Sequence, residues 1–219
     1  TTPEQKIMKT AMFGGDMVEV KLVGDYFDDT LAAAQAYCAE HGAHFLSPFD
    51  DEDVIEGQAV VGAEISDQLG GLPDVLVVPV GGGGLSAGLR SFFGPGVDMR
   101  CVEPTGAMSL AAALDAGEPV DISPVDSFVD GASVAKLGAR TYARLKDVPK
   151  DHVLALDEDR ICSTILEMLN VEGIVLEPAG ALSIEALSEL RNVIRGKRVV
   201  AIATGGIFDF ERLPEVKER

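Results

Sequence analysis

The chain has 219 residues, of which 47% are hydrophobic and 25% are charged, as in an ordinary globular protein. The 36 Asp and Glu residues outnumber the 18 Lys and Arg residues, and the resulting net charge of -18 argues against nucleic acid or an anionic membrane surface as a partner, because both would repel the chain. The longest apolar runs, Val75–Val80 and Val199–Ala203, are far shorter than the ~20 residues that a membrane span requires.

The first 47 residues predict a small α/β unit. Thr2 to Gln5 resemble a capping box at the start of a helix, which is expected to end at Gly14. The spacing of apolar residues then predicts a strand over Met17–Val23, a helix over Phe27–Glu40 and a short strand over His44–Leu46. We therefore expect this segment to be the remainder of a small α/β domain.

Longer elements are predicted from Pro48 onward, where strands alternate with helices. The acidic run Asp50–Asp53 precedes a helix predicted to end near Leu69, and negative charge suits the positive end of a helix. Strands are predicted over Val75–Val80, Met99–Glu103, Val153–Leu156 and Arg198–Ala203, with helices over Met108–Ala116, Ala139–Leu145, Glu158–Leu169 and Pro178–Arg191. The alternation predicts one large α/β domain over residues 48–219, a parallel sheet flanked by helices on both faces.

A run of four glycines is the strongest local signal for a functional site. Gly81, Gly82, Gly83 and Gly84 follow an apolar strand and precede Leu85 at the start of a helix. Main-chain N–H groups without side chains in front of them, at a helix N-terminus, form a cradle for phosphate. A tight turn that needs permissive glycine backbone is the simpler alternative, but one or two glycines would satisfy it. We expect a phosphate or another anion here.

The identity of the phosphate ligand stays open on spacing alone. Gly82 and Gly84, with Glu103 about twenty residues later, imitate a weak dinucleotide fingerprint, so a nicotinamide-dependent oxidoreductase is one alternative. A Walker-type loop is excluded because no Gly-Lys-Ser or Gly-Lys-Thr occurs. A second turn, Thr204-Gly205-Gly206, ends the last predicted strand, and ligands bind beyond the carboxyl ends of parallel strands. The two glycine turns are therefore expected to border one crevice.

Cysteine and histidine usage favours neither a metal site nor a disulfide framework. Cys38, His41 and His44 have a zinc-like spacing, but they span a helix end and a strand start and have no fourth ligand nearby. The three cysteines are odd in number and widely spaced, which indicates reduced thiols and a cytoplasmic protein. His152 has no Ser or Cys nucleophile pattern around it, so no catalytic triad is predicted.

Several motifs, taken in order, resemble those of threonine dehydratases, which are pyridoxal-phosphate enzymes of the tryptophan-synthase-β-like fold. The segments that carry the resemblance are Ser47-Pro48-Phe49-Asp50-Asp51, Pro79 to Leu85, Val102-Glu103-Pro104, Phe128-Val129-Asp130-Gly131, Glu177-Pro178-Ala179-Gly180-Ala181 and Thr204-Gly205-Gly206. The resemblance covers essentially the whole chain and is nearest to the biosynthetic members.

The resemblance implies a cofactor, a reaction and site residues. Gly81, Gly82, Gly83, Gly84 and Leu85 would hold the phosphate of pyridoxal 5'-phosphate, and Thr204 would place a hydroxyl where the family usually has a serine facing the pyridine nitrogen. The implied reaction converts L-threonine, or L-serine, to a 2-oxo acid and ammonia. For threonine the product is 2-oxobutanoate, which leads to isoleucine. Family members are usually dimers or tetramers, so a homo-oligomer is expected of the intact protein.

Two departures from the family pattern limit what this chain is expected to do. A related racemase branch binds a divalent cation at positions that are Glu103, Ala107 and Ser109 here, so a carboxylate is missing and no metal is expected. Family members also attach the cofactor to a Schiff-base lysine in a Ser-x-Lys context near their N-terminus, and no lysine of this chain has that context. Catalysis by this chain alone is therefore not expected.

The sequence thus indicates an incomplete dehydratase fold, in which the lysine-bearing segment precedes Thr1 and a regulatory region follows Arg219 in complete members. A non-catalytic relative that kept the phosphate cradle is the second hypothesis, and the nicotinamide-dependent oxidoreductase is the third.

Overall fold

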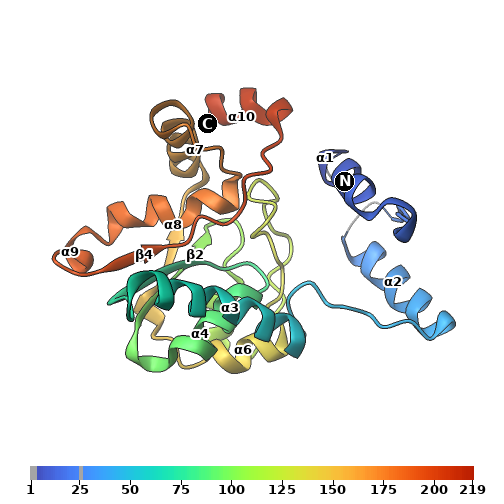
Figure 1. The fold of residues 1–219 in the computed structure, drawn as a ribbon, viewed down its shortest axis with the longest axis horizontal. Helices are drawn as coiled ribbons and strands as arrows, with labels where there is room; N and C mark the ends of the chain where they lie inside the picture. Colours follow the sequence, from blue (N-terminus) through green and yellow to red (C-terminus); the bar gives the residue numbers. More distant parts are fainter. Residues whose placement is uncertain (1–3, 25–26) are drawn as a thin grey trace. The chain divides into compact units, whose positions relative to one another are not determined.

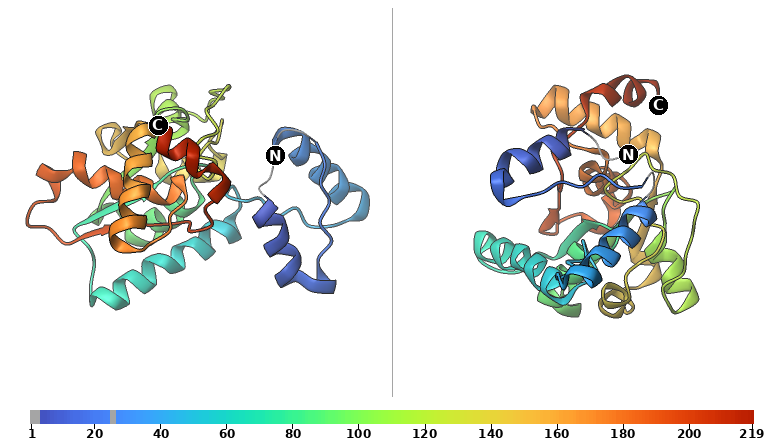
Figure 2. Two further views of the ribbon diagram at one scale, coloured as in Figure 1. Left: turned by 90° about the horizontal axis from the view of Figure 1, so that it is seen from above. Right: turned by 90° about the vertical axis from the view of Figure 1, so that its right-hand side faces the viewer.

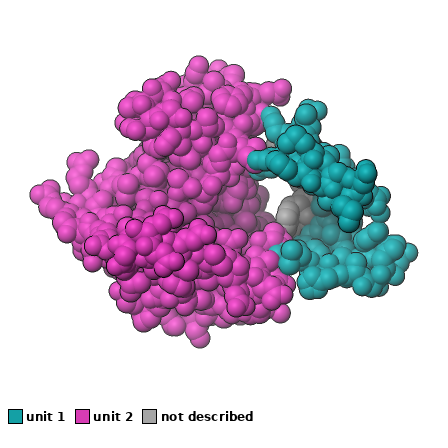
Figure 3. Space-filling model, viewed as in Figure 1, with its two compact units in different colours: residues 1–47 teal, residues 48–219 magenta. Residues whose placement is uncertain are grey.

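The computed structural model describes residues 4–24 and 27–219 and divides the chain into two compact units, 1–47 and 48–219 (Figure 3). The predicted capping box at Thr2 begins outside the described residues. Within the described residues, no helix combines the length and the apolar character needed to cross a membrane.

The first unit contains helices and extended chain. Helix α1 covers Glu4–Gly14, a 3-10 turn η1 covers Gly15–Met17, and helix α2 covers Phe27–His41. The strands predicted over Met17–Val23 and His44–Leu46 are wrong, since these described residues form no strand. Alternating apolar residues favour an extended chain, but a strand also needs a neighbour to share its main-chain hydrogen bonds.

The second unit has the predicted α/β order (Figure 1). Its strands are β1 (Val75–Pro79), β2 (Asp98–Pro104), β3 (Val153–Leu156) and β4 (Val199–Ala201). Its helices are α3 (Glu52–Leu69), α4 (Gly84–Phe93), α5 (Ser109–Ala116), α6 (Ala139–Leu145), α7 (Glu158–Glu167), α8 (Pro178–Glu189), α9 (Arg191–Ile194) and α10 (Leu213–Glu218). Short 3-10 turns lie at Gly94–Gly96, Lys150–His152 and Phe210–Arg212, and a π-helical turn at Met168–Glu172 follows α7.

The four strands form one parallel sheet in the order β3-β2-β1-β4, which confirms the predicted fold class. Strand β1 is central and buried along its whole length. β4 pairs with β1 at three positions, from Val75 opposite Val199 to Val77 opposite Ala201, so it is shorter than the predicted Arg198–Ala203. The carboxyl ends of β1 and β4 therefore lie side by side.

Helices cover both faces of the sheet, as predicted, because successive side chains of β1 point to opposite faces. Val75 and Val77 pack into a core with residues of α7, α8 and α10. Leu76 and Val78 pack into a second core with residues of α3, α4, α5 and α6. Figure 1 and the right-hand view of Figure 2 show α3 and α7 on opposite sides of the strands.

Candidate functional site at the carboxyl edge of the sheet

The glycine loop connects the central strand to helix α4. β1 ends at Pro79, and α4 begins at Gly84 with Gly83 as its N-cap residue at a φ of 87°, a left-handed conformation that favours glycine. The first N–H groups of a helix have no partner within the helix and mark its positive end. The Ser86 hydroxyl donates to the Pro79 carbonyl oxygen at 3.0 Å and ties the first turn of α4 back to the strand. The loop therefore presents main-chain donors at the carboxyl edge of the sheet.

Each of the four glycines also lies against other parts of the protein. An added Cβ would lie 3.0 Å from the Gly131 carbonyl oxygen at Gly81, 2.2 Å from the Phe49 ring at Gly82, 3.0 Å from the Thr141 side chain at Gly83 and 3.1 Å from Phe49 at Gly84. Close packing alone is therefore a sufficient reason for a glycine at each of the four positions. The expectation of a phosphate depends on the helix N-terminus and the main-chain donors, more than on the number of glycines.

Helix α6 anchors the loop from one side. The Thr141 hydroxyl lies 2.9 Å from the Gly82 carbonyl oxygen and 3.1 Å from that of Gly138. The carboxylate of Asp50 accepts hydrogen bonds from the N–H groups of Ala139, Arg140 and Thr141 at 3.1, 2.7 and 3.2 Å and so caps α6. The sequence pattern assigned the whole acidic run to α3. In the structure Asp51 caps α3, whereas Asp50 caps a helix 89 to 91 positions away.

The remaining motif segments meet the glycine loop through close main-chain approaches. An added Cβ at Gly131 would lie 2.9 Å from the Ala179 side chain and 3.4 Å from Oε1 of Glu177. At Gly205 it would lie 1.8 Å from the same Oε1, and at Gly180 it would lie 2.5 Å from the Gly205 carbonyl oxygen. The Glu177 N–H donates to that oxygen at 2.9 Å. Four segments that are far apart in the sequence thus converge at one edge of the sheet.

Thr204 belongs to this group of segments by position. It follows the last residue of β4 by three positions and is exposed. Its neighbour Gly205 provides the contacts with Glu177 and Gly180 described above. The structure therefore brings Gly81, Gly82, Gly83, Gly84, Leu85 and Thr204 to the carboxyl ends of two neighbouring strands.

Glu103 does not occupy the position that the dinucleotide alternative needs. Its side chain is fully buried, and its carboxylate accepts the N–H groups of Leu110 at 2.7 Å and Ala111 at 3.0 Å, at the start of α5. Desolvation raises the pKa of Glu103 to about 7, against the hydrogen bonds that stabilise its charged form. A carboxylate committed to a helix N-terminus is not available to the hydroxyls of a ribose. The structure thus disfavours the alternative that pairs Gly82 and Gly84 with Glu103.

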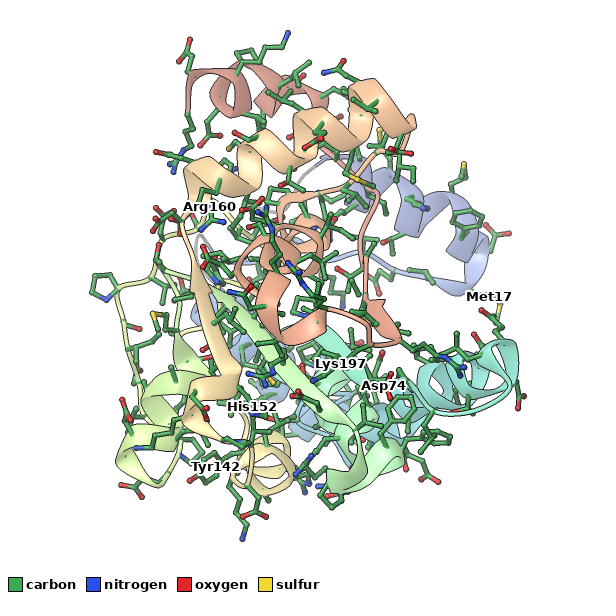
Figure 4. The ribbon with its side chains drawn as sticks, turned by 90° about the vertical axis from the view of Figure 1, so that its left-hand side faces the viewer. Met17, Asp74, Tyr142, His152, Arg160 and Lys197 are labelled. Atoms are coloured by element: carbon green, nitrogen blue, oxygen red, sulfur yellow. The ribbon has the colours of Figure 1, made fainter. Side chains whose placement is uncertain are left out.

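The lysines of the second unit show no role at this edge. All five are exposed, namely Lys136, Lys146, Lys150, Lys197 and Lys217. Lys150 pairs with Asp115, and Lys197 lies 3.7 Å from Asp98 at the start of β2. His152 and Arg100 also lie close to Asp98, so a charged cluster occupies the amino-terminal edge of the sheet, where Figure 4 labels His152, Lys197 and Asp74. The two edges therefore carry different chemistry.

The thiols and imidazoles have ordinary structural surroundings. Burial raises the pKa of Cys101 to about 12 and that of Cys162 to about 11, so both thiols stay protonated at neutral pH. The His41 ring stacks on Tyr37, and its Nδ1 lies 2.9 Å from the Tyr37 carbonyl oxygen. Within the part of the chain that the structure describes, no group of three His, Cys, Asp or Glu residues could hold a metal ion.

Comparison with known proteins identifies the family. Residues 1–205 match the model of a family described as pyridoxal-phosphate dependent enzymes. The chain belongs to this family. The match covers both units and every motif of the site except Gly206, the last residue of the second glycine turn.

Several relatives of this chain are threonine dehydratases. The chain is 43% identical to L-threonine dehydratase biosynthetic IlvA of Lactococcus lactis and 40% identical to that of Bacillus subtilis, with all of this chain and 54% and 52% of those proteins covered. The solved structure of the processed form of threonine deaminase isoform 2 from Solanum lycopersicum is 36% identical, has a TM-score of 0.88, and is covered to 64% by the whole of this chain. The chain thus spans about half the length of the curated relatives it matches.

The residues of the glycine loop fit the phosphate that the family name implies. The loop combines the N-terminus of a ten-residue helix with glycine main chain, and Gly81 to Leu85 include no acidic side chain that would repel an anion. The contacts of Thr141 and Ser109 with the loop, and of Asp50 with α6, were not predicted from the sequence, because each joins segments that are distant in the chain.

Proposed function

We propose that this chain is the cofactor-phosphate part of a pyridoxal-phosphate-dependent threonine ammonia-lyase, a protein of the cytoplasm in the route to isoleucine. The single observation that carries the proposal is the convergence of the Gly81 loop with Gly131, Glu177 and Gly205 at the carboxyl edge of the sheet. The similarity to threonine dehydratases over the whole chain supports the choice of substrate. The intact protein is proposed to be a homo-oligomer.

In this proposal the N–H groups of Gly81 to Leu85 bind the cofactor phosphate, and the positive end of α4 stabilises its charge. Thr204 would provide the neutral hydroxyl that faces the pyridine nitrogen of the bound cofactor. When bound, pyridoxal 5'-phosphate withdraws electrons from the substrate α-carbon, so that the α-proton and then the β-hydroxyl can leave. The β-hydroxyl would leave as water, and one water molecule would then hydrolyse the released imine, so that the net products are 2-oxobutanoate and ammonia.

No residue of this chain is proposed to transfer the α-proton, because none of its lysines has the Ser-x-Lys context and those of the second unit are exposed. The 219-residue chain by itself should therefore release no 2-oxobutanoate from L-threonine. A non-catalytic relative that binds the cofactor remains the second candidate, and the same lysine observation favours it.

Sequencing the DNA immediately upstream of the Thr1 codon, followed by assay of the whole gene product, separates the two candidates. An open frame that continues into a Ser-x-Lys segment, with cofactor-dependent 2-oxobutanoate release by that product, supports the lyase. Cofactor binding without release supports the non-catalytic relative. Turnover by the purified 219-residue chain would refute the assignment of catalysis to a segment outside it.

A further inference from the structure

A buried hydroxyl links the glycine loop to the start of helix α5. Ser109 is fully buried, and its Oγ lies 3.4 Å from the Gly81 carbonyl oxygen and 3.5 Å from Oε1 of Glu103. A serine hydroxyl has one proton, so it donates to one of these two acceptors at a time. The acceptor that receives this proton decides whether the Gly81 carbonyl has a side-chain donor.

The charge on Glu103 determines which acceptor is preferred. A carboxylate attracts a hydroxyl proton more strongly than a neutral carbonyl does, because charge-assisted hydrogen bonds are roughly twice as strong as neutral ones. When Glu103 is charged, the Ser109 proton turns to Oε1. When Glu103 is neutral, the hydroxyl is free to donate to Gly81. The peptide that joins Gly81 to Gly82 then becomes more polarised, and its N–H is a better donor to an anion.

We propose that Ser109 and Glu103 act together as positioning residues for the glycine loop, with the Ser109 hydroxyl relaying the charge state of Glu103 to the Gly81 peptide. The phosphate part of this inference rests on the proposed function of the loop. The hydrogen-bond relay itself rests on the distances above. Affinity for phosphate should be higher when Glu103 is neutral.

Glu103 is the group of the relay that changes its charge near neutral pH. Its pKa is about 7, with burial as the dominant cause. Cys101, on the same strand, stays protonated because burial and the charge of Glu103 raise its pKa to about 12, and Arg90 of α4 acts on that thiol in the opposite direction. From α7, Glu158 turns to Thr105 and Gly106, which donate to it at 2.9 and 3.0 Å. From α5, Glu103 receives the main-chain donors already described.

The relay is tested first by nuclear magnetic resonance on the 219-residue chain labelled with 15N-glycine. The Gly82 amide nitrogen follows the Gly81 carbonyl, so its chemical shift should titrate between pH 6 and pH 8 in the wild type. In Glu103→Gln and Ser109→Ala the shift should stay nearly flat. Ser91→Ala is the matched control, since that hydroxyl bonds Ala87 within α4 and should leave the titration unchanged. If the Gly82 nitrogen shift of Ser109→Ala changed with pH as much as that of the wild type, the relay would be overturned.

The consequence for the cofactor is tested on the whole gene product by fluorescence titration with pyridoxal 5'-phosphate at pH 6 and pH 8. From pH 6 to pH 8, the Kd of the wild type should rise about 3- to 10-fold more than the Kd of Glu103→Gln. A factor of this size corresponds to the loss of one hydrogen bond. Ser109→Ala should lose most of this difference. Pyridoxal, which has no phosphate, should show none of it. Equal pH dependence in wild type and Ser109→Ala would refute positioning by the relay. A gene product that binds no cofactor would refute the proposed function. The pH dependence of the Gly82 shift would still test the relay, because that measurement needs no cofactor.

Discussion

The Glu103 carboxyl is fully buried, and desolvation raises its pKa to about 7 although Leu110, Ala111 and Ser109 stabilise its charged form. The same carboxyl in the unfolded chain titrates near its ordinary value, which is about 4.3. Between these two pKa values the folded protein binds more protons than the unfolded chain does. The free energy of unfolding must therefore fall as the pH rises through this window, and Glu103 should add no further pH dependence above it.

We predict that Glu103→Gln removes this pH dependence. From pH 5 to pH 7, the free energy of unfolding of the wild type should fall relative to that of the variant, by up to ~1.4 kcal/mol per pH unit. Urea unfolding at pH 5, 6, 7 and 8 measures the difference, and all other groups titrate alike in both proteins. Two parallel curves over this range would show that Glu103 titrates normally in the fold.

A second prediction concerns the contact between Gly205 and Glu177. Gly205→Ala would place a Cβ 1.8 Å from Oε1 of Glu177, so the carboxylate must move away. We expect destabilisation of about 1–3 kcal/mol, the usual cost of overpacking, and weaker cofactor binding. In a Glu177→Ala background the same Cβ has room, and the cost should shrink. Chemical denaturation of both single variants and the double variant measures this coupling, and strictly additive effects would contradict the contact.

At the level of single residues, the contacts of Asp50, Thr141 and Ser109 could not be predicted from the sequence. The motif residues that carry the family resemblance could be recognised because they are contiguous in the chain. Asp50 caps α6 and Thr141 bonds the Gly82 carbonyl, and both contacts depend on folding that brings segments 59 or more positions apart together. No local pattern distinguishes such an aspartate from one that caps its own helix.

Among the elements, α3 and α4 form a tight pair, and Gly88 is one of their close contacts. An added Cβ there would lie 2.6 Å from the Ile55 carbonyl oxygen and 2.8 Å from the Ala59 nitrogen, both main-chain atoms of α3. Main-chain atoms within a helix cannot move away from an added methyl group as easily as the atoms of a side chain can. The absence of a side chain at Gly88 therefore sets the distance between the two helices.

We predict that Gly88→Ala destabilises the second unit by about 1–3 kcal/mol, because α3 and α4 must separate. Gly57→Ala is the matched control. Its added Cβ would meet nothing within 4 Å on the exposed side of α3, and alanine should stabilise that helix by about 1 kcal/mol. Guanidinium denaturation midpoints of the two variants should move in opposite directions. Equal shifts would mean that Gly88 is not at a close helix contact.

The elements also show why the second unit could be predicted more completely than the first. Apolar runs such as Val75–Val80 indicate strands buried on both faces, and this unit contains the neighbouring strands that pair with them. The Met17–Val23 segment has an equally clear alternation, yet no strand forms there. Periodicity reports which face of a segment is apolar, whereas pairing depends on residues elsewhere.

At the scale of the whole molecule, burial differs sharply between the units. No residue of α1 is buried, and Met17 is 91% exposed (labelled in Figure 4), whereas every residue of β1 is buried. Regions with few buried apolar contacts open at low free-energy cost. We predict that the amides of residues 4–24 exchange with solvent deuterium orders of magnitude faster than those of β1. Mass spectrometry of peptic fragments tests this, and comparable protection in the two segments would contradict it.

The pairing of β4 with the free side of β1 has a consequence for biosynthesis. Helices α3 and α4 and strands β2 and β3 can assemble around β1 as soon as they leave the ribosome, but β4 is made more than a hundred residues after β1. At ordinary elongation rates this interval is roughly ten seconds. Throughout it the central strand has unpaired main-chain groups on one side, so the nascent chain is most exposed to chaperone capture, or to misassembly with another copy, during this period.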